Sequence, residues 1–467
     1  MSMLRVPSLE IVYLITGVLL IIGLKFLSSP ARAKTGNLLA GIGMVLAVVV
    51  TGLDTRILNW TDIIIGALIG VPIGYFSARA VKMTAMPQMV ALFNGAGGGA
   101  AALVASGEYL RLNAAHATTP GELVPILLSL IIGAVSFAGS LVAFAKLQEL
   151  MTGRPVTYPG QQVVNALIVL AIVALCVLML VGHATPPLFV AVAVLAALLG
   201  VVGVLPIGGA DMPVVISLLN SFTGVAVAIT GFVLGSTVLI ISGTLVGASG
   251  TLLTMLMSKA MNRSLANVLF GAFGSAPKGG AGGAAAAGGG GPVRSASAED
   301  VATLLAYSRS VIIAPGYGMA VAQAQHSVRE LSAALEKRGV DVKFAIHPVA
   351  GRMPGHMNVL LAEANVPYSQ LFEMDQINPE FEHTDVALVI GANDVTNPAA
   401  RNVSNSPIYG MPILDVDKAA NVIVLKRSMN PGFAGIDNPL YENPKCMMLF
   451  GDAKDSVSKL AAGVAAA

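Results

Sequence analysis

Roughly the first 265 residues alternate between long apolar stretches and short polar connections, and this spacing predicts a polytopic α-helical membrane bundle. A helix of about 20 apolar residues crosses a bilayer. Nine stretches reach about that length, namely residues 8–27, 36–53, 62–81, 87–106, 123–147, 162–182, 187–206, 212–234 and 237–258. We expect no cleavable signal peptide, because the first stretch is too long for one and further spans follow.

The connections between these spans carry an uneven charge that predicts their orientation. Positively charged residues in short connections favour the cytoplasmic side of a membrane. With nine spans, one side collects nine Lys and Arg residues and the other only three. The first set is Lys25, Arg32, Lys34, Arg79, Lys82, Lys146, Arg154, Lys259 and Arg263, and the second is Arg5, Arg56 and Arg111. We therefore expect the N-terminus outside and the C-terminal domain in the cytoplasm.

After the last span the composition becomes that of a soluble protein. Residues 1–273 hold 19 charged residues, whereas residues 274–467 hold 33. The segment Gly274–Pro292 has nine Gly and six Ala among its 19 residues, too little apolar side chain to fold alone. The expected domains are a transmembrane domain at 1–265, a Gly/Ala-rich linker at 266–299 and a nucleotide-binding domain at 300–467.

Composition also argues against several classes of function. Neither part has the basic stripe that nucleic-acid binding requires. Two cysteines, Cys176 and Cys446, cannot build a disulfide framework. No metal site is expected, and no span carries the paired histidines that would ligate a haem.

From about residue 300 the pattern becomes one of alternating strands and helices. The predicted strands are 310–314, 342–346, 386–390, 421–425 and 446–450, and the predicted helices are 319–338 and 357–364. Such alternation is typical of an α/β doubly wound, Rossmann-like domain with a parallel sheet. About 165 residues suffice for one such domain and one dinucleotide.

A glycine turn follows the first of these strands and opens the next helix, as in dinucleotide-binding βαβ units. We expect Gly316 to permit the tight bend and Gly318 to let a pyrophosphate approach the backbone. The candidate cofactor-binding run is Gly316, Tyr317, Gly318, Met319, Ala320 and Val321, with Val321 where Gly or Ala is usual.

The neighbouring strands favour NADP(H) over NAD(H). The second strand runs into His347 and Pro348 and lacks the acidic residue that binds a ribose 2′-hydroxyl. The strand at 421–425 is followed by Lys426, Arg427 and Ser428, two cations and a hydroxyl that suit a 2′-phosphate. The alternative interpretation of these three residues is a solvated basic edge.

Two further loops follow strands of the same predicted sheet. One contains Gly351 and Arg352, a candidate phosphate or amide contact, and the other contains Gly391, Asn393 and Asp394. Because the strands are expected to be parallel, all of these loops should meet at the carboxyl edge, where such sheets bind ligands.

Polar residues at membrane depth are costly and are candidates for a proton pathway. The candidates are Asn94, Ser140, Asp211 and Asn220. In the eighth span Ser217, Asn220, Ser221 and Gly224 share one helix face, and in the fifth span Gly133, Ser136 and Ser140 do. The alternative is helix packing, in which small residues let backbones approach and amides or hydroxyls bond across helices; the small pair Gly243 and Gly247 fits that alternative.

The spans lack an obvious titrating group. None of the six histidines lies in a span core, and no Lys, Arg or Glu lies mid-span. If protons cross the membrane here, waters beside Asn94 and Asn220 or a partner helix must carry them.

Several motifs together resemble the beta subunit of the proton-translocating NAD(P) transhydrogenase. The likeness covers essentially the whole chain except the Gly/Ala tether. The matching segments are Gly208–Pro213, Ser258–Ser264, Pro315–Gln325, His347–Leu361, Gly391–Asp394 and Lys426–Asn430.

The resemblance implies a function that this chain performs only together with a second subunit. This chain would hold NADP(H), and a separate alpha subunit with further membrane helices would hold NAD(H). Hydride would pass directly between the two nicotinamides, coupled to inward proton movement, in a dimer of such assemblies in the bacterial cytoplasmic (inner) membrane. Such chemistry needs no catalytic acid from the protein.

The resemblance also implies roles for individual residues. The run 316–321 would wrap the pyrophosphate, Lys426, Arg427 and Ser428 would hold the 2′-phosphate, and Arg352 and Asp394 would line the nicotinamide half. Gly432, Phe433 and Ala434 would close over the nucleotide, and 403–418 would be a mobile lid. Asn220 and Asp211 would belong to the proton channel and its cytoplasmic mouth. Some relatives carry histidine where Asn94 stands, which points to a proton-binding group on a partner chain.

Two other functions remain open from the residues alone. One is a nucleotide-regulated ion channel or transporter, although a Thr-Val-Gly-Tyr-Gly filter is absent. The other is a membrane reductase that delivers electrons to quinone or haem, which the lack of paired span histidines disfavours.

Overall fold

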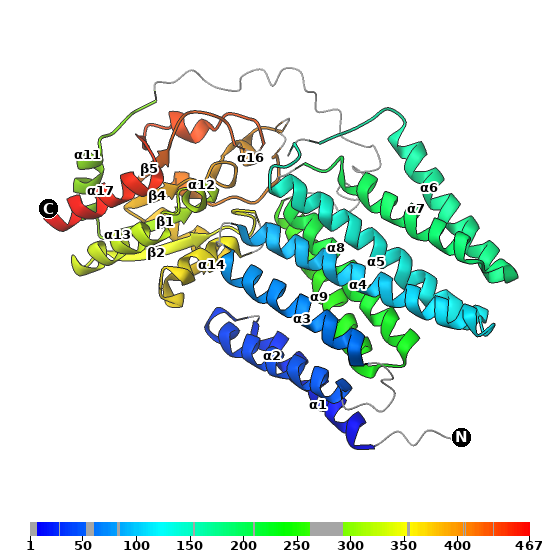
Figure 1. Ribbon diagram of the computed structural model, residues 1–467. Coiled ribbons are helices and arrows are strands. Elements are labelled where there is room, and N and C mark those ends of the chain that lie inside the picture. The colour runs from blue at the N-terminus through cyan, green and yellow to red at the C-terminus, as the bar shows by residue number, and fades with distance from the viewer. Residues whose placement is uncertain are drawn as a thin grey trace. The chain divides into compact units, whose positions relative to one another are not determined.

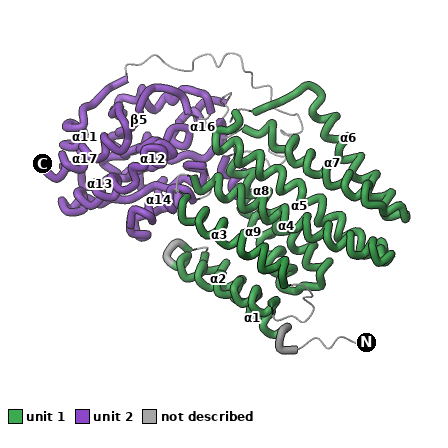
Figure 2. Tube along the Cα trace, in the orientation of Figure 1, with its two compact units in different colours: residues 1–254, 269–274 green, residues 255–268, 275–467 purple. Residues whose placement is uncertain are grey.

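A computed structural model describes residues 7–27, 29–52, 60–81, 85–152, 155–208, 211–261, 293–352, 355–404, 406, 408–432 and 434–467. The chain divides into two compact units, shown in different colours in Figure 2. Among the described residues the boundary lies between Thr254 and Met255, within the last long helix, whose final residues belong to the second unit. The first unit is helical, and the second contains a parallel sheet.

The helical unit consists of long helices joined by short connections. They are α1 (Pro7–Leu27), α2 (Pro30–Gly52), α3 (Trp60–Ala80), α4 (Met86–Ala114), α5 (Pro120–Leu147), α6 (Gln161–Leu178) with a π-helical end η2 (Met179–His183), α7 (Pro186–Val204), α8 (Met212–Leu234) and α9 (Thr237–Ala260). In the described part of the chain, eight helices are long and apolar enough to cross a membrane. The apolar part of α1, Ile11–Leu27, is shorter, so the ninth span stays a prediction.

The helices pack through both bulky and very small residues. Tyr109 of α4 and Phe189 of α7 stack with ring centroids 4.0 Å apart inside an apolar core. Where α4 meets α5, a Cβ added to Gly133 would lie 2.7 Å from the Gly98 carbonyl oxygen. Where α8 meets α9, one added to Gly243 would lie 2.3 Å from the Ala228 nitrogen. The backbones therefore touch, as the packing interpretation of these glycines predicts.

The second unit is built on six parallel strands in the order β3-β2-β1-β4-β5-β6. Four of them, β1, β2, β4 and β5, are labelled in Figure 1. The strands are β1 (Ser310–Pro315), β2 (Asp341–Ile346), β3 (Leu371–Glu373), β4 (Val386–Ile390), β5 (Asn421–Lys426) and β6 (Cys446–Phe450). Its helices are α11 (Ala298–Ala306), α12 (Tyr317–Val321), α13 (Gln325–Lys337), α14 (His356–Glu363), α15 (Met374–Ile377), α16 (Ala399–Asn402) and α17 (Ala453–Ala466). Short 3₁₀ turns are η3 (Tyr368–Gln370), η4 (Asn378–His383), η5 (Asp394–Thr396), η6 (Val416–Lys418) and η7 (Pro439–Glu442).

The sheet is buried on both faces, and its strands are apolar at nearly every position. Alternate residues such as Ile312, Ala387 and Val422 pack with Met374 and Phe381 on one side. On the other side α11, α13 and α17 lie together, with α13 against β2 and α17 against β5. Two covered faces explain why these strands are runs of apolar residues.

Most predicted elements of this unit match the structure within a residue or two, one predicted helix needs correction, and several elements were not predicted. The helix expected at 319–338 is two helices, α12 and α13, separated by a turn in which Gln323 has φ 51°. The edge strand β3 was not predicted because three residues are too few to show a pattern. The helices α11 and α17, which flank the sheet sequence, were not predicted either.

Candidate functional site

Four of the loops singled out by sequence follow strands that end at one edge of the sheet. They are 316–321 after β1, 347–352 after β2, 391–394 after β4 and 427–434 after β5. Strand order runs outward from β1 through β2 on one side and from β4 on the other, so the direction of winding changes between β1 and β4. Open α/β sheets bind ligands at the carboxyl side of such a switch point.

The glycine turns after β1 and β4 touch each other directly. Gly316 N–H donates to the Ile390 carbonyl and Gly318 N–H donates to the Gly391 carbonyl, each at 2.9 Å. A Cβ on Gly316 would lie 2.4 Å from Ala392 Cα, and one on Gly391, which has φ 66°, would lie 2.4 Å from Gly318 Cα. Only glycine fits this contact, which leaves backbone rather than side chains at the switch point.

The side chains of the β1 turn divide between the core and the surface. Met319 and Ala320 are fully buried, whereas Tyr317 is half-buried and Val321 is 46% exposed. An exposed Val321 explains why this position does not need Gly or Ala, because its side chain enters no close contact between helix and sheet.

Arg352 joins the loop after β2 to the turn after β1. Its guanidinium carbon lies 4.6 Å from the centroid of the Tyr317 ring, within the range of cation–π attraction. Its backbone N–H donates to His356 Nδ1 at 3.1 Å. The preceding Gly351 has φ 107°, a conformation that side chains rarely adopt.

Asn393 connects the loop after β4 to the loop after β5. In the amide orientation that satisfies both of its ends, its oxygen accepts from Gly432 N–H at 2.8 Å and from Lys426 Nζ at 3.2 Å. The same amide lies 2.8 Å from the Tyr441 hydroxyl. Burial raises the pKa of Tyr441, so this hydroxyl stays protonated.

Asp394 contacts the segment that was expected to close over a nucleotide. Its Oδ2 accepts from Ala434 N–H at 2.9 Å, and a Cβ on Gly432 would lie 2.5 Å from its Oδ1. Phe433, the middle residue of this segment, lies outside the described residues.

The three residues expected to hold a 2′-phosphate differ in their surroundings. Lys426 is half-buried, with Nζ 4.9 Å from the centroid of the Tyr441 ring, and burial lowers its pKa. Arg427 and Ser428 are exposed, and Arg427 Nε lies 3.9 Å from Asp452 Oδ2. An ion pair that long and that exposed contributes little to stability, so the guanidinium can exchange it for an anion.

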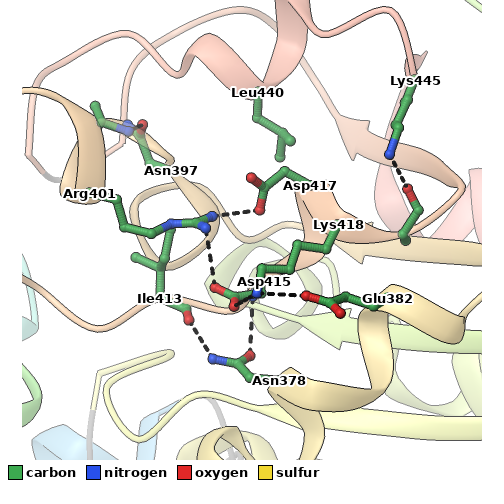
Figure 3. A network of polar contacts seen from close by, with 12 residues as sticks. Asn378, Glu382, Asn397, Arg401, Ile413, Asp415, Asp417, Lys418, Leu440 and Lys445 are labelled. Atoms are coloured by element: carbon green, nitrogen blue, oxygen red, sulfur yellow. Dashed lines mark hydrogen bonds and ion pairs between the residues drawn. The ribbon is translucent and has the colours of Figure 1, made fainter.

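The stretch 403–418, expected to form a lid, is tied to its surroundings by charge pairs (Figure 3). Arg401 lies 2.6 Å from an oxygen of Asp417 and 3.6 Å from one of Asp415. The Asn378 side-chain oxygen accepts from Asp415 N–H at 3.1 Å. The two ends of the stretch are therefore held close together.

A separate buried histidine stabilises the loop after β2. His347 Nε2 lies 2.8 Å from the Pro412 carbonyl, to which it donates, and its Nδ1 accepts from Val349 N–H at 3.3 Å. Burial lowers the pKa of His347 to about 4, so the imidazole is neutral at physiological pH.

In the helical unit, Asn94 and Ser140 meet at the contact of α4 and α5. Asn94 Nδ2 donates to Ser140 Oγ at 2.9 Å and to Ser136 Oγ at 3.4 Å. Ser136 Oγ in turn lies 2.6 Å from Thr223 Oγ1 of α8. Asn94 is 7% exposed, and its Oδ1 has no hydrogen-bond partner among the described residues.

The polar face predicted for α8 serves mainly to pack that helix on α9. Ser217 Oγ donates to the Gly250 carbonyl at 3.2 Å, and Ser221 Oγ donates to the Gly247 carbonyl at 2.8 Å. Asn220 is half-buried and makes no side-chain hydrogen bond within the described part of the chain.

Asp211 immediately precedes α8 and accepts through its backbone carbonyl from the first turn of that helix. The structure thus brings Asn94 and Ser140 together, and it joins neither Asn220 nor Asp211 to them by a hydrogen bond between described residues.

Three residues at these contacts were missed by sequence reasoning. Thr223 sits between Asn94 and Ser136 but looked like an ordinary helix residue. Tyr441 and His356 hold candidate residues from elements that no pattern connects to the strand ends.

Comparison with known proteins gives a consistent result. A family model described as the NAD(P) transhydrogenase beta subunit matches residues 9–463. Two curated relatives from Rhodospirillum rubrum, one of them from a designated strain, are each named NAD(P) transhydrogenase subunit beta. Each is 50% identical over 453 residues, which cover 96% of this chain and 97% of the relative. The chain belongs to this family.

Membership of the transhydrogenase beta-subunit family confirms the resemblance found in the sequence. It makes the chain a subunit of an oxidoreductase, and the family name implies the use of NAD(P)(H). A beta subunit also implies an alpha subunit as partner. The apolar helices indicate a membrane protein.

Proposed function

We propose that this chain is the NADP(H)-binding, membrane-spanning subunit of a proton-translocating transhydrogenase. NADH bound to the alpha subunit donates hydride directly to NADP⁺ bound here, and inward proton movement drives the reaction. The observation that carries the proposal is the contact of Gly316 and Gly318 with Gly391 at the strand switch point, with Lys426 close by and no acidic residue after β2.

The residues at this edge fit a dinucleotide by shape. Backbone fills the switch point because a Cβ at Gly316, Gly318 or Gly391 would collide with the opposite turn. Glycines at such positions let a pyrophosphate approach main-chain atoms. Strand order 3-2-1-4-5-6 is also the order of dinucleotide-binding Rossmann sheets, which supports the same assignment.

The preference for NADP(H) rests on charge. Lys426, Arg427 and Ser428 would hold the 2′-phosphate, with Arg427 able to make paired bonds to it. Lys426 is already oriented by Asn393 and by the Tyr441 ring. No carboxylate follows β2 to bind a 2′-hydroxyl, which disfavours NAD(H) in this chain.

The nicotinamide half would lie near Arg352 and Asp394. Bound NADP⁺ accepts hydride at its nicotinamide ring. The protein fixes where that ring lies: Tyr317 holds the Arg352 guanidinium, and Asp394 holds the 432–434 segment through Ala434 N–H. Since the cofactors exchange hydride directly, no side chain needs to transfer a proton to them.

The proton pathway would run past Asn94 and Ser140 in α4 and α5, with Asp211 at the cytoplasmic mouth and Asn220 along α8. Asn94 Oδ1 has no partner among the described residues, which supports this placement, because a buried amide oxygen of this kind can receive a water. Moving one charge through ~150 mV is worth ~3.5 kcal/mol, enough to shift an equilibrium several hundredfold. The titrating group would belong to a partner chain, and the assembly would be a dimer in the inner membrane with the N-terminus outside.

The test is to co-express the chain with an alpha subunit and reconstitute the complex in vesicles that maintain a proton gradient. We expect NADPH formation from NADH and NADP⁺ to slow several-fold when an uncoupler is added. The Arg427→Ala variant should raise the concentration of NADP⁺ needed for half-maximal rate, whereas Arg309→Ala, which precedes β1 and so lies at the opposite edge of the sheet, should not.

Three outcomes would contradict parts of the proposal. An unchanged rate with uncoupler would rule out coupling to protons. Equal effects of the two arginine variants would rule out the 2′-phosphate site. Coupled proton uptake by a complex that lacks residues 300–467 would rule out a role of the nucleotide domain in coupling.

A further inference from the structure

His356 is a fully buried histidine at the first position of α14, directly behind the loop that carries Arg352. Its ring packs against the backbone of Gly351, where an added Cβ would lie 2.4 Å from His356 Nδ1. Since Gly351 also has φ 107°, the loop can follow this path only with glycine at position 351.

One hydrogen bond fixes the protonation of this ring. Arg352 N–H donates to His356 Nδ1 at 3.1 Å, so Nδ1 is the acceptor and the proton of the neutral ring is on Nε2. Burial, together with the nearby Arg352 charge, lowers the pKa of His356 to about 4. The neutral, accepting form is therefore the one present at physiological pH.

Arg352 is consequently held at both ends. Its backbone is bonded to His356, and its guanidinium lies 4.6 Å from the centroid of the Tyr317 ring. The Tyr317 and His356 rings are themselves 6.5 Å apart, so the three residues form one group that joins α14 to the β1 turn. Nothing else in this group requires an imidazole, because a branched apolar side chain would fill the same buried space.

An imidazole at this place carries a cost that packing does not explain. His356 Nε2 is buried and has no hydrogen-bond partner among the described residues. A buried donor left unpaired is unfavourable. The hydrogen bond that Nδ1 accepts from Arg352 N–H is therefore the contact that favours an imidazole over an apolar side chain at this position.

We propose that His356 is a positioning residue for nucleotide binding: it holds the Gly351–Arg352 backbone so that the Arg352 side chain meets the bound NADP(H). The proposal rests on the proposed function, because it assigns to His356 the orientation of a residue in that nucleotide site. His356 itself does not touch the nucleotide, since its side chain is fully buried.

The experiment compares three substitutions of His356 and Arg352 in the full chain, purified in detergent, by titration with NADPH. His356→Leu removes the acceptor and keeps the volume, and we expect the Kd for NADPH to rise about tenfold. His356→Asn keeps an acceptor near the position of Nδ1, and its Kd should stay within about threefold of wild type. Arg352→Ala should raise Kd at least as much as His356→Leu.

The double variant His356→Leu, Arg352→Ala separates positioning from a general loss of structure. If His356 acts through Arg352, adding His356→Leu to Arg352→Ala should change Kd less than twofold, because contacts in one network are not additive. The matched control is His326→Leu, an exposed histidine on α13, which should leave Kd unchanged.

Each result has a defined meaning. A tenfold effect of His356→Leu that persists undiminished in the Arg352→Ala background would overturn the positioning role, as would a His356→Leu chain that binds NADPH like wild type. Equal losses in His356→Asn and His356→Leu would also overturn it. Absence of saturable NADPH binding in the wild-type chain would contradict the proposed function itself and is recognisable before any variant is made.

Discussion

Both units of the molecule use glycine to bring two backbones into contact, and they do so with opposite consequences. Between α8 and α9, Gly243 and Gly247 let serine hydroxyls of α8 reach carbonyls of α9, so the polar groups satisfy one another. Between the β1 and β4 turns, Gly318 and Gly391 touch, and charged side chains remain around them. Polar residues in the first contact hold helices together, whereas those around the second, such as Asp394 and Lys426, hold the loops that we propose to bind a nucleotide.

Asn94 is one of several residues in the helices with a buried polar atom that has no hydrogen-bond partner among the described residues. Its amide nitrogen is bonded within the α4–α5 contact, but its oxygen has no partner among the described residues. A buried polar atom without a partner calls for an explanation, and a water on the proposed proton pathway would supply one.

The largest expected effect concerns the contact of the two glycine turns. Gly391→Ala places a Cβ 2.4 Å from Gly318 Cα at a residue with φ 66°. We expect the strain and the collision together to lower the free energy of unfolding of this unit by about 3 kcal/mol or more and to abolish detectable NADPH binding. Hydrogen exchange of β1 and β4 amides in the full chain measures the first effect, and NADPH titration measures the second.

Gly339→Ala is the matched control for that variant. Gly339 also has positive φ, 83°, but an added Cβ there meets no atom within 4 Å. It should therefore cost only about 1 kcal/mol and leave NADPH binding intact. Similar losses in both variants would show that backbone strain, rather than contact of the turns, makes Gly391 necessary.

The sheet edge could be predicted from sequence far better than the helix contacts could. In a parallel sheet every strand ends at the same edge, so Gly316, Gly391 and Lys426 could be expected at one edge once their strands were recognised. No such rule pairs helices of a bundle. The partner of Asn94 depends on which helix lies beside α4, and Thr223 was missed for that reason.

The same reason explains what was missed in the α/β unit. His356 and Tyr441 lie in α14 and η7 rather than in loops that follow strands, and they act on the edge through tertiary contacts. The break between α12 and α13 depends on a single residue, Gln323, in a left-handed conformation that glutamine rarely adopts.

Lowering the pH should have an effect of intermediate size on the stability of the α/β unit. The pKa values of His347 and His356 are about 4 in the folded chain against an ordinary 6.5. Between these values the unfolded chain binds protons that the folded chain does not, so stability falls as pH drops from about 6.5 towards 4. The loss is at most roughly 3 kcal/mol per histidine.

Hydrogen exchange of the β1 and β4 amides at pH 4.5 and pH 7, corrected for intrinsic exchange rates, measures this dependence. His347→Asn and His356→Asn should each remove part of it, because asparagine does not titrate. A dependence of unchanged size in the double variant would contradict the assignment to these two histidines. The residues that bond α8 to α9, among them Ser217, Ser221, Gly247 and Gly250, do not titrate, so amides at this contact should not follow the same curve.

The smallest expected effect separates the two asparagines of the helical unit. Asn94→Ala removes the 2.9 Å bond to Ser140 and should lower the stability of the bundle by about 1 kcal/mol, the usual size of such bonds between membrane helices. Asn220→Ala removes no side-chain hydrogen bond between described residues and should change stability by much less. Unfolding in mixed detergent micelles, followed by circular dichroism, measures both.

If Asn94→Ala also lowers uncoupler-sensitive transhydrogenation while Asn220→Ala does not, Asn94 belongs to the pathway and the α8 face belongs to packing. If only Asn220→Ala slows transhydrogenation, the half-buried Asn220 amide, which makes no side-chain hydrogen bond to a described residue, is the functional one. The polar face of α8 would then contain both packing residues and a residue of the pathway.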